Sequence, residues 1–207
     1  MVELPKRKYN RLEGYDYNLN GAYFVTVCAK DRQDLFAKYD VGANSVRPQI
    51  NNNDDDECFG KLVDSPNIKL SDIGHIIDKS INNIEQIYED VFIDKYIIMP
   101  DHVHIIIVFD RDTNEKDGRT IVGAIIDRPN SGEHCSPLHY PKLSRIIKQW
   151  KGVVTKKVGF PIWQKSFYDH IIRNEEDYHM IINYIENNPL KLEMVRNEPF
   201  GKIEPLK

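Results

Sequence analysis

Hydrophobic positions along the chain follow two different periods. Runs rich in β-branched and aromatic residues predict strands at residues 21–30, 91–99 and 102–109. Only Pro100 and Asp101 separate the last two runs, so we expect those strands to pair antiparallel. A further short hairpin is predicted between residues 59–63 and 67–70.

Helical periodicity takes over between these runs. Isoleucines at spacings of three and four, preceded by the capping residues Ser71 and Asp72, predict a helix that runs to about Glu89. A second helix around residues 143–157 has an apolar stripe on one side and cations on the other. After an extended segment, a last helix begins at Asn174 and should end near Asn188, because Pro189 follows.

This order of strands and helices favours one fold class. We predict an α+β fold in which helices pack on an antiparallel sheet. The 207 residues are expected to form a single domain, 1–207, with polar loop insertions at about 39–57 and 110–141. No apolar run is long enough to span a membrane and no leader-like segment opens the chain, which predicts a cytoplasmic protein without a membrane partner. Its three scattered cysteines suggest neither disulfides nor a thiolate metal site.

Charge is distributed unevenly along the chain. The net charge is −4, yet residues 139–173 carry eight cations and one acid, a local charge of about +7. Such a block can bind a polyanion, although a cationic helix face is more often simply solvated. Aromatic residues nearby could stack on bases, but Trp163 and Phe167 could equally belong to the core. The candidate contacts from this segment are Arg145, Lys148, Lys151, Trp163, Lys165, Tyr168 and Arg173.

Two histidines interrupt the most apolar strand, in the sequence HVHIIIVF. Side chains two residues apart in a strand share a face, so His102 and His104 should lie together, with Val103 and Ile105 turned to the core. Two neighbouring imidazoles can supply half of a transition-metal site. The alternative is that both rings merely have hydrogen-bond partners or solvent on that face.

The last helix places two polar groups side by side. Tyr184 lies about 110° from the centre of the helix's apolar stripe, so packing does not require it there. Asn188 follows one turn later, within about 40° of Tyr184 around the helix. A phenol and an amide should therefore project together, unless Asn188 serves only as a helix cap.

These segments together resemble a known family, the single-tyrosine HUH transposases, in their REP-associated tyrosine transposase branch. The similarity covers about residues 8–36 and 71–195 and leaves out the two insertions. A short HUH motif alone has little specificity, whereas four motifs in this order are specific. They are PDHVH at 100–104, LSRIIKQWK at 143–151, IWQKSFYDHIIRNEEDY at 162–178 and NYIENNPLK at 183–191.

The resemblance implies a fold, a chemistry and a set of residues. The fold would be the RRM-like, ferredoxin-like sheet of HUH endonucleases. A divalent metal, Mg²⁺ or Mn²⁺, would be held by His102, His104 and Asn188, and Tyr184 would be the nucleophile. Tyr184 would attack a phosphodiester of single-stranded or hairpin DNA, leaving a 5′-phosphotyrosine and a free 3′-OH that can reverse the step. Gln164 and His170, both within the motifs, are further candidate DNA contacts, and such enzymes act as monomers or homodimers.

Two rival interpretations predict different roles for the same residues. A catalytically silent module of this fold would bind repeat DNA or RNA without needing Tyr184. A metal-dependent phosphoesterase would use water as its nucleophile, and it would depend on the histidines but not on Tyr184. The sequence offers little acid beside HVH apart from Asp101, which makes the second interpretation the weaker one.

Overall fold

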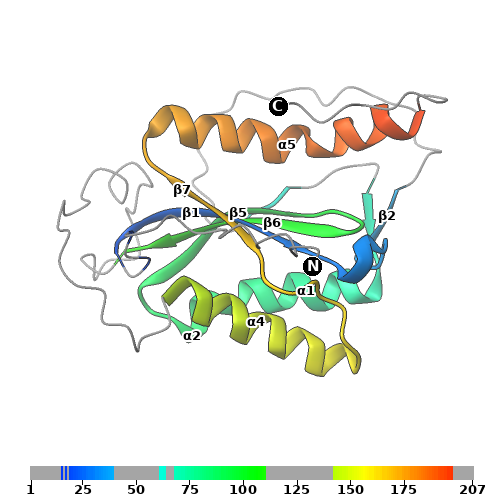
Figure 1. Ribbon diagram of the computed structural model, residues 1–207, viewed down its shortest axis with the longest axis horizontal. Coiled ribbons are helices and arrows are strands. Elements are labelled where there is room, and N and C mark those ends of the chain that lie inside the picture. Colours follow the sequence, from blue (N-terminus) through cyan, green and yellow to red (C-terminus); the bar gives the residue numbers. More distant parts are fainter. Residues whose placement is uncertain are drawn as a thin grey trace, which may run out of the picture.

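The computed structural model describes residues 15, 17, 19–39, 61–63, 68–110 and 142–197 (Figure 1). Apart from Tyr39 and Asp110, both predicted insertions lie outside these residues. The helical elements are η1 (Lys30–Arg32), α1 (Asp72–Asn82), α2 (Ile84–Ile87), α4 (Lys142–Val158) and α5 (Glu175–Asn197). The strands are β1 (Gly21–Cys28), β2 (Ala37–Tyr39), β3 (Lys61–Leu62), β4 (Ile68–Leu70), β5 (Val91–Ile98), β6 (His102–Phe109) and β7 (Tyr168–Ile172).

The main sheet has the order β3-β5-β6-β1-β7. Strands β5, β6, β1 and β7 are antiparallel, and the two-residue β3 adds in parallel at one edge. Along the chain, β1, α1, β5, β6, α4 and β7 form the βαββαβ order of a ferredoxin-like sheet. The predicted α+β class, an antiparallel sheet with packed helices, is therefore confirmed.

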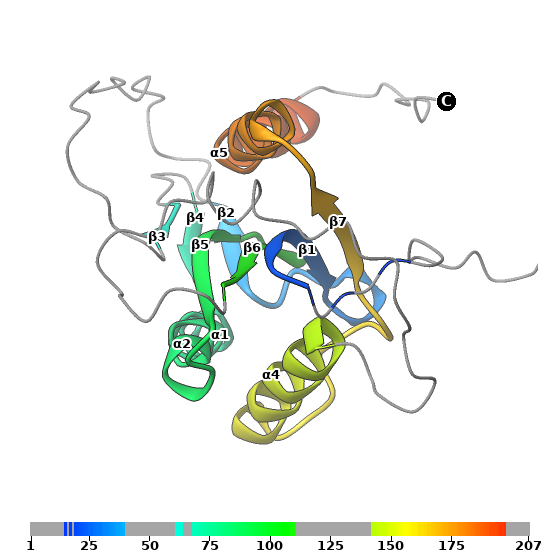
Figure 2. The ribbon, with the colours of Figure 1, turned by 90° about the vertical axis from the view of Figure 1, so that its left-hand side faces the viewer.

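Helices cover both faces of this sheet (Figure 2). Helices α1 and α4 pack on one face, where their apolar stripes meet the strand residues that include Val103, Ile105 and Ile107. Helix α5 lies on the other face, where Ile181 and Ile185 pack against side chains such as Ile106 and Val108. We call these the α1/α4 face and the α5 face of the sheet.

Helix α1 begins where the sequence predicts. The Ser71 side chain accepts a hydrogen bond from the Gly74 N–H, which satisfies one of the otherwise unpaired donors of the first turn. The predicted single helix to Glu89 is wrong, however, because it breaks at Asn83 and continues as α2. Glu85 of α2 accepts a hydrogen bond from the backbone N–H of Ile93, so the second piece is directed onto β5.

The predicted hairpin between residues 59–63 and 67–70 is also wrong. Strand β3 pairs with β5, while β4 pairs antiparallel with β2 in a separate two-stranded sheet. Both segments are too short for their pattern to specify a partner strand. Each pairs instead with a strand from elsewhere in the chain.

Helix α5 does not end near Asn188, which corrects the third prediction. It runs through Pro189 to Asn197. Proline inside a helix removes one backbone hydrogen bond and costs roughly 3 kcal/mol. Ile185, Asn188 and Pro189 are all buried, so packing of this turn against the sheet offsets the local preference. Within the described residues, no helix is long and apolar enough to cross a membrane.

Candidate functional site

Strand β6 places the two histidines as its alternation predicts. Both lie on the α5 face, whereas Val103 and Ile105 pack into the core of the α1/α4 face. The α5 face is not open around them, because α5 covers this part of β6 and leaves His104 only 3% exposed. A polar ring is thus buried where the neighbouring positions are Ile and Val.

The two imidazoles point their Nε2 atoms at each other, 3.0 Å apart. Each ring is held from its other side by an oxygen atom. His102 Nδ1 lies 2.6 Å from Asp101 Oδ1, and His104 Nδ1 lies 2.8 Å from the Thr26 hydroxyl on β1. Where these oxygens accept from Nδ1–H groups, both Nε2 lone pairs are directed to one point.

Helix α5 brings its two predicted residues beside His104. Asn188 is 8% exposed, and its amide Nδ2 lies 3.3 Å from His104 Nε2. The Tyr184 ring centre lies 5.2 Å from that of His104, with the planes inclined at 69°. Tyr184 also meets Phe24 of β1 edge to face and is 39% exposed. One chain therefore assembles all four residues, and Asn188 is not a helix cap.

The donor geometry fits a divalent cation. Adjacent ligands of an octahedral ion with bonds of about 2.1 Å lie about 3.0 Å apart. The Nε2 atoms of His102 and His104 have this separation, and a half-turn of the Asn188 amide would present its oxygen beside them. No cluster of three or more His, Cys, Asp or Glu side chains suited to a metal occurs in the part of the chain that the structure describes. The candidate set is thus two imidazoles and an amide.

Burial keeps the His104 imidazole neutral. Burial, followed by the influence of the neighbouring His102 and Arg32, lowers the pKa of His104 to about 3. For Asp101, burial alone would raise the pKa, but its hydrogen bond and charge attraction to His102, together with Arg32, lower it below the ordinary value. At neutral pH His104 is therefore a neutral imidazole, near an ionised carboxylate.

Sequence reasoning missed two of these partners, Thr26 and Arg32. Thr26 lies opposite His104 in the β1–β6 register, and Arg32 Nη1 lies 3.1 Å from Asp101 Oδ2. No local sequence pattern predicts the pairing of segments that lie some 70 residues apart in the chain. The only signal was Asp101 itself, directly before HVH.

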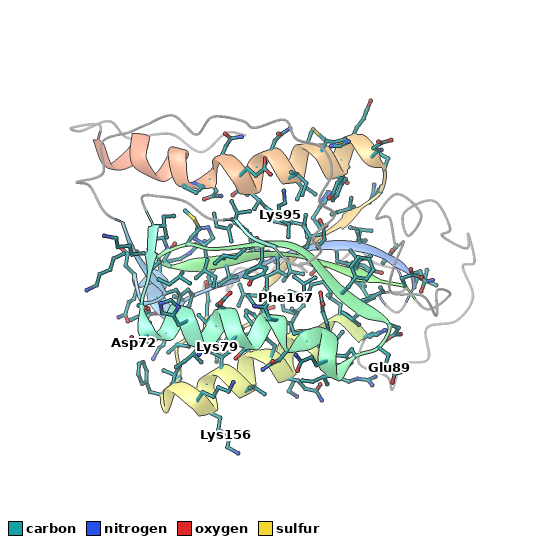
Figure 3. All side chains as sticks on the ribbon, turned by 180° about the vertical axis from the view of Figure 1, so that it is seen from behind. Asp72, Lys79, Glu89, Lys95, Lys156 and Phe167 are labelled. Atoms are coloured by element: carbon teal, nitrogen blue, oxygen red, sulfur yellow. The ribbon has the colours of Figure 1, made fainter. Side chains whose placement is uncertain are left out.

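The predicted cationic helix face lies away from this site. Arg145 and Lys148 are exposed on α4, on the α1/α4 face, whereas the histidines lie on the α5 face. Figure 3 shows Lys156 of α4 directed away from the sheet, and it shows Lys95 between the sheet and α5. The structure therefore does not bring the α4 cations together with Tyr184.

Lys151 of α4 and the segment that follows this helix have structural partners. Lys151 Nζ donates to the carbonyl oxygens of Gln164 and Ser166, each at 2.8 Å, and burial lowers its pKa to about 8. The Trp163 indole donates to the Lys151 carbonyl while its ring packs against Phe36. Lys151 and Trp163 thus tie the 163–166 segment to α4, and the partly buried Trp163 packs against the core, in line with the alternative interpretation.

Strand β7 carries residues that do share the α5 face. Tyr168 lies opposite Thr26, in line with His104, and is 52% exposed. One position further along the same face, His170 lies opposite Phe24, and its Nε2 is 2.9 Å from Asp177 Oδ2 at the start of α5. The same carboxylate accepts from the Arg173 backbone N–H, so this group joins β7 to α5.

Known proteins provide a fold comparison. No family model matches the chain. An uncharacterized protein of Haemophilus influenzae is 28% identical over 189 residues, covering 89% of this chain and 88% of that protein. A solved REP-associated tyrosine transposase bound to a REP hairpin superposes with a TM-score of 0.52 at 19% identity, over 95% of this chain and 77% of that one. A structure from Deinococcus radiodurans, provisionally named a transposase, has a TM-score of 0.38 at 14% identity, over 90% of this chain and 97% of that one. The chain shares its fold with the first of these structures.

Proposed function

We propose that the protein is a metal-dependent enzyme that nicks and rejoins single-stranded DNA, with Tyr184 as its nucleophile. The observation that carries this proposal is that one chain brings two Nε2 atoms and a buried amide together and packs the Tyr184 ring against one of the two imidazoles. Packing alone would have favoured apolar side chains at His104 and Asn188, since buried polar groups are costly without partners. The shared fold with a REP-associated tyrosine transposase is consistent with it.

His102, His104 and Asn188 would hold the cation, Mg²⁺ or Mn²⁺. Two nitrogens and one amide oxygen fill only half of an octahedral shell, which leaves room for substrate oxygens. A bound divalent cation would polarise a non-bridging phosphate oxygen and stabilise the charge that develops on it. Asp101 and Thr26 would keep the two rings turned so that their lone pairs face that position.

Tyr184 supplies the nucleophile for an exchange of phosphodiesters. Its oxygen forms a bond to phosphorus as the bond from phosphorus to the 3′-oxygen breaks, giving a 5′-phosphotyrosine and a 3′-OH. The phenol gives up a proton to water, and the departing oxygen takes one from water. Because one ester replaces another, the 3′-OH can reverse the step, and rejoining requires no external energy source.

The substrate strand would lie on the α5 face beside β1 and β7. Phe24, Tyr168 and Tyr184 offer aromatic surfaces there, and bases stack on such surfaces with little dependence on sequence. A REP-type hairpin is the more specific substrate that we propose, with Arg145 and Lys148 on the opposite face available only to DNA that extends around the domain. The protein would act as a monomer, since its own α5 completes the site.

Covalent capture of DNA tests this function directly. Purified protein with Mn²⁺ and an oligonucleotide containing a hairpin from its own genome should give an adduct that survives denaturation, and Tyr184→Phe should give none. Tyr168→Phe, which keeps an aromatic ring on the same face, is the matched control and should retain the adduct. If strand cleavage persists in Tyr184→Phe, water is the nucleophile and the phosphoesterase interpretation holds. Tight binding without cleavage by wild type would identify a silent binding module.

A further inference from the structure

Two residues beside His102, Asp101 and Arg32, are neither proposed metal ligands nor the proposed nucleophile. Asp101 uses one carboxylate oxygen for His102 Nδ1, at 2.6 Å, and the other for Arg32 Nη1, at 3.1 Å. Its side chain is 22% exposed, whereas that of Arg32 is 56% exposed. A continuous chain of contacts therefore leads from the surface through a carboxylate to the imidazole.

Backbone contacts fix the position of this chain of side chains. The turn between β5 and β6 is joined to the segment after β1 by two hydrogen bonds, from the N–H of Ala29 to the Asp101 carbonyl at 2.7 Å and from the N–H of Phe36 to the Pro100 carbonyl at 2.9 Å. Asp31 and Arg32 both have positive φ, 56° and 54°, which few residues other than glycine adopt. Surrounding structure thus holds Arg32 in a demanding conformation that directs its guanidinium to Asp101.

We propose that Asp101 and Arg32 are positioning residues that hold His102 in the tautomer with its proton on Nδ1. A neutral imidazole carries one proton, so a carboxylate that accepts from Nδ1–H leaves the lone pair on Nε2. Arg32 keeps the second carboxylate oxygen occupied and prevents the side chain from turning away. The inference rests on the proposed function, because it assigns the metal-binding nitrogen of that same site.

The two histidines differ in how firmly they are held. The acceptor beside His102 is an ionised carboxylate, and hydrogen bonds to ionised groups are about twice as strong as neutral ones. The partner of His104 is the Thr26 hydroxyl, which can donate as well as accept. His102, with 15% of its side chain exposed, is also the less buried ring and so the one that depends more on a bonded partner. Loss of Asp101 should therefore affect the site more than loss of the Thr26 hydroxyl.

Nitrogen NMR of the histidine rings, in protein freed of metal by a chelator, measures the tautomer without any reaction. Wild type should show the Nδ1–H form for His102. Asp101→Ala should shift it toward the Nε2–H form and weaken Mn²⁺ binding, followed by calorimetry, by about 10–100-fold. Arg32→Gln should produce a smaller change of the same kind, and because this side chain is exposed, the variant keeps the test usable if Asp101 variants fail to fold.

Asp31→Asn is the matched control. It removes a carboxylate from the same turn, and asparagine tolerates a positive φ, so tautomer and Mn²⁺ affinity should stay at wild-type values. Three results would overturn the positioning role: a wild-type His102 with its proton on Nε2, unchanged Mn²⁺ affinity in both Asp101→Ala and Arg32→Gln, or no Mn²⁺ binding by wild type. If the tautomer and affinity respond as expected but no DNA adduct ever forms, the positioning role stands and the nicking function fails.

Discussion

The two faces of the sheet differ in what they bury. On the α1/α4 face, β6 contributes Val103, Ile105 and Ile107 to a continuous apolar core. On the α5 face, the same strand contributes Ile106 and Val108, but the apolar surface is interrupted by His104, with Asn188 of α5 above it. Among the described residues, the buried polar side chains are Ser80, His104 and Asn188, and Ser80 is satisfied by its own helix. The α1/α4 face is packed almost entirely with apolar side chains, whereas the α5 face buries two polar side chains, His104 and Asn188, at one point.

The largest difference between the faces should appear in unfolding free energy. Ile105→Ala leaves a cavity in the α1/α4 core and should lower the unfolding free energy by about 2–5 kcal/mol. Asn188→Leu extends the apolar stripe of α5. It should change the unfolding free energy by less than about 1 kcal/mol, or raise it, because residues kept for function are rarely optimal for stability. Urea unfolding of the metal-free protein measures both.

Metal binding should rank the same two variants in the opposite order. Calorimetry with Mn²⁺ should find wild-type affinity in Ile105→Ala, wherever that protein is folded, and weakened affinity in Asn188→Leu. If Asn188→Leu were instead strongly destabilised, Asn188 would be a structural residue and the contrast between the faces would disappear.

A smaller effect, and one that depends on pH, is expected where α5 joins β5. Tyr178 Oη donates to Asp94 Oδ2 at 3.0 Å, and burial raises the Asp94 pKa to about 6, against the opposing influence of Tyr178 and Lys95. As the pH falls, the Asp94 carboxylate therefore binds a proton at a higher pH in the native state than in the unfolded state, where its pKa is 3.8. The contribution of Asp94 to stability should rise as pH falls from about 7 to about 4, by up to about 3 kcal/mol.

Asp94→Asn isolates that contribution, because an amide oxygen can still accept from Tyr178. The variant should be more stable than wild type at pH 7.5, and the difference should shrink toward pH 4.5 in urea unfolding. Glu186→Gln is the control: it breaks the Lys95–Glu186 pair between the same two elements, at 2.6 Å, but an exposed pair contributes only about 0–1 kcal/mol. A difference between Asp94→Asn and wild type that does not vary with pH would show that Asp94 is ionised at both values.

Local periodicity predicted where the four central residues lie within their own elements, while the family resemblance singled them out as a site. Alternation in a strand put His102 and His104 on one face, and helical spacing put Tyr184 and Asn188 on one flank. Neither pattern required knowledge of strand partners. Each depends only on backbone geometry within one element, which is why the prediction and the structure agree.

What sequence could not supply was the pairing of distant elements. The contacts of Thr26 with His104 and of Arg32 with Asp101 follow from the register of β1 against β6 and from the segment after β1. The separate partners of β3 and β4 have the same origin, since two or three residues specify no register. Likewise, the basic stripe of α4 was visible in the sequence, but the face of the sheet that it covers was not.

Binding of a short single strand of DNA should also distinguish the two faces. Tyr168 lies on the α5 face in line with His104, so Tyr168→Ala should weaken binding of an oligonucleotide of about six bases by about 1–3 kcal/mol, the contribution of one stacked base. Lys148→Gln, on α4, removes a charge from the opposite face and should change that affinity less than twofold at 150 mM salt. At this salt concentration, charges more than about 8 Å apart are largely screened from each other. Fluorescence anisotropy with a labelled strand compares the two variants with wild type. A larger loss from Lys148→Gln than from Tyr168→Ala would place the strand on the α1/α4 face, away from Tyr184, and would leave the aromatic surface of β7 without a part in substrate binding.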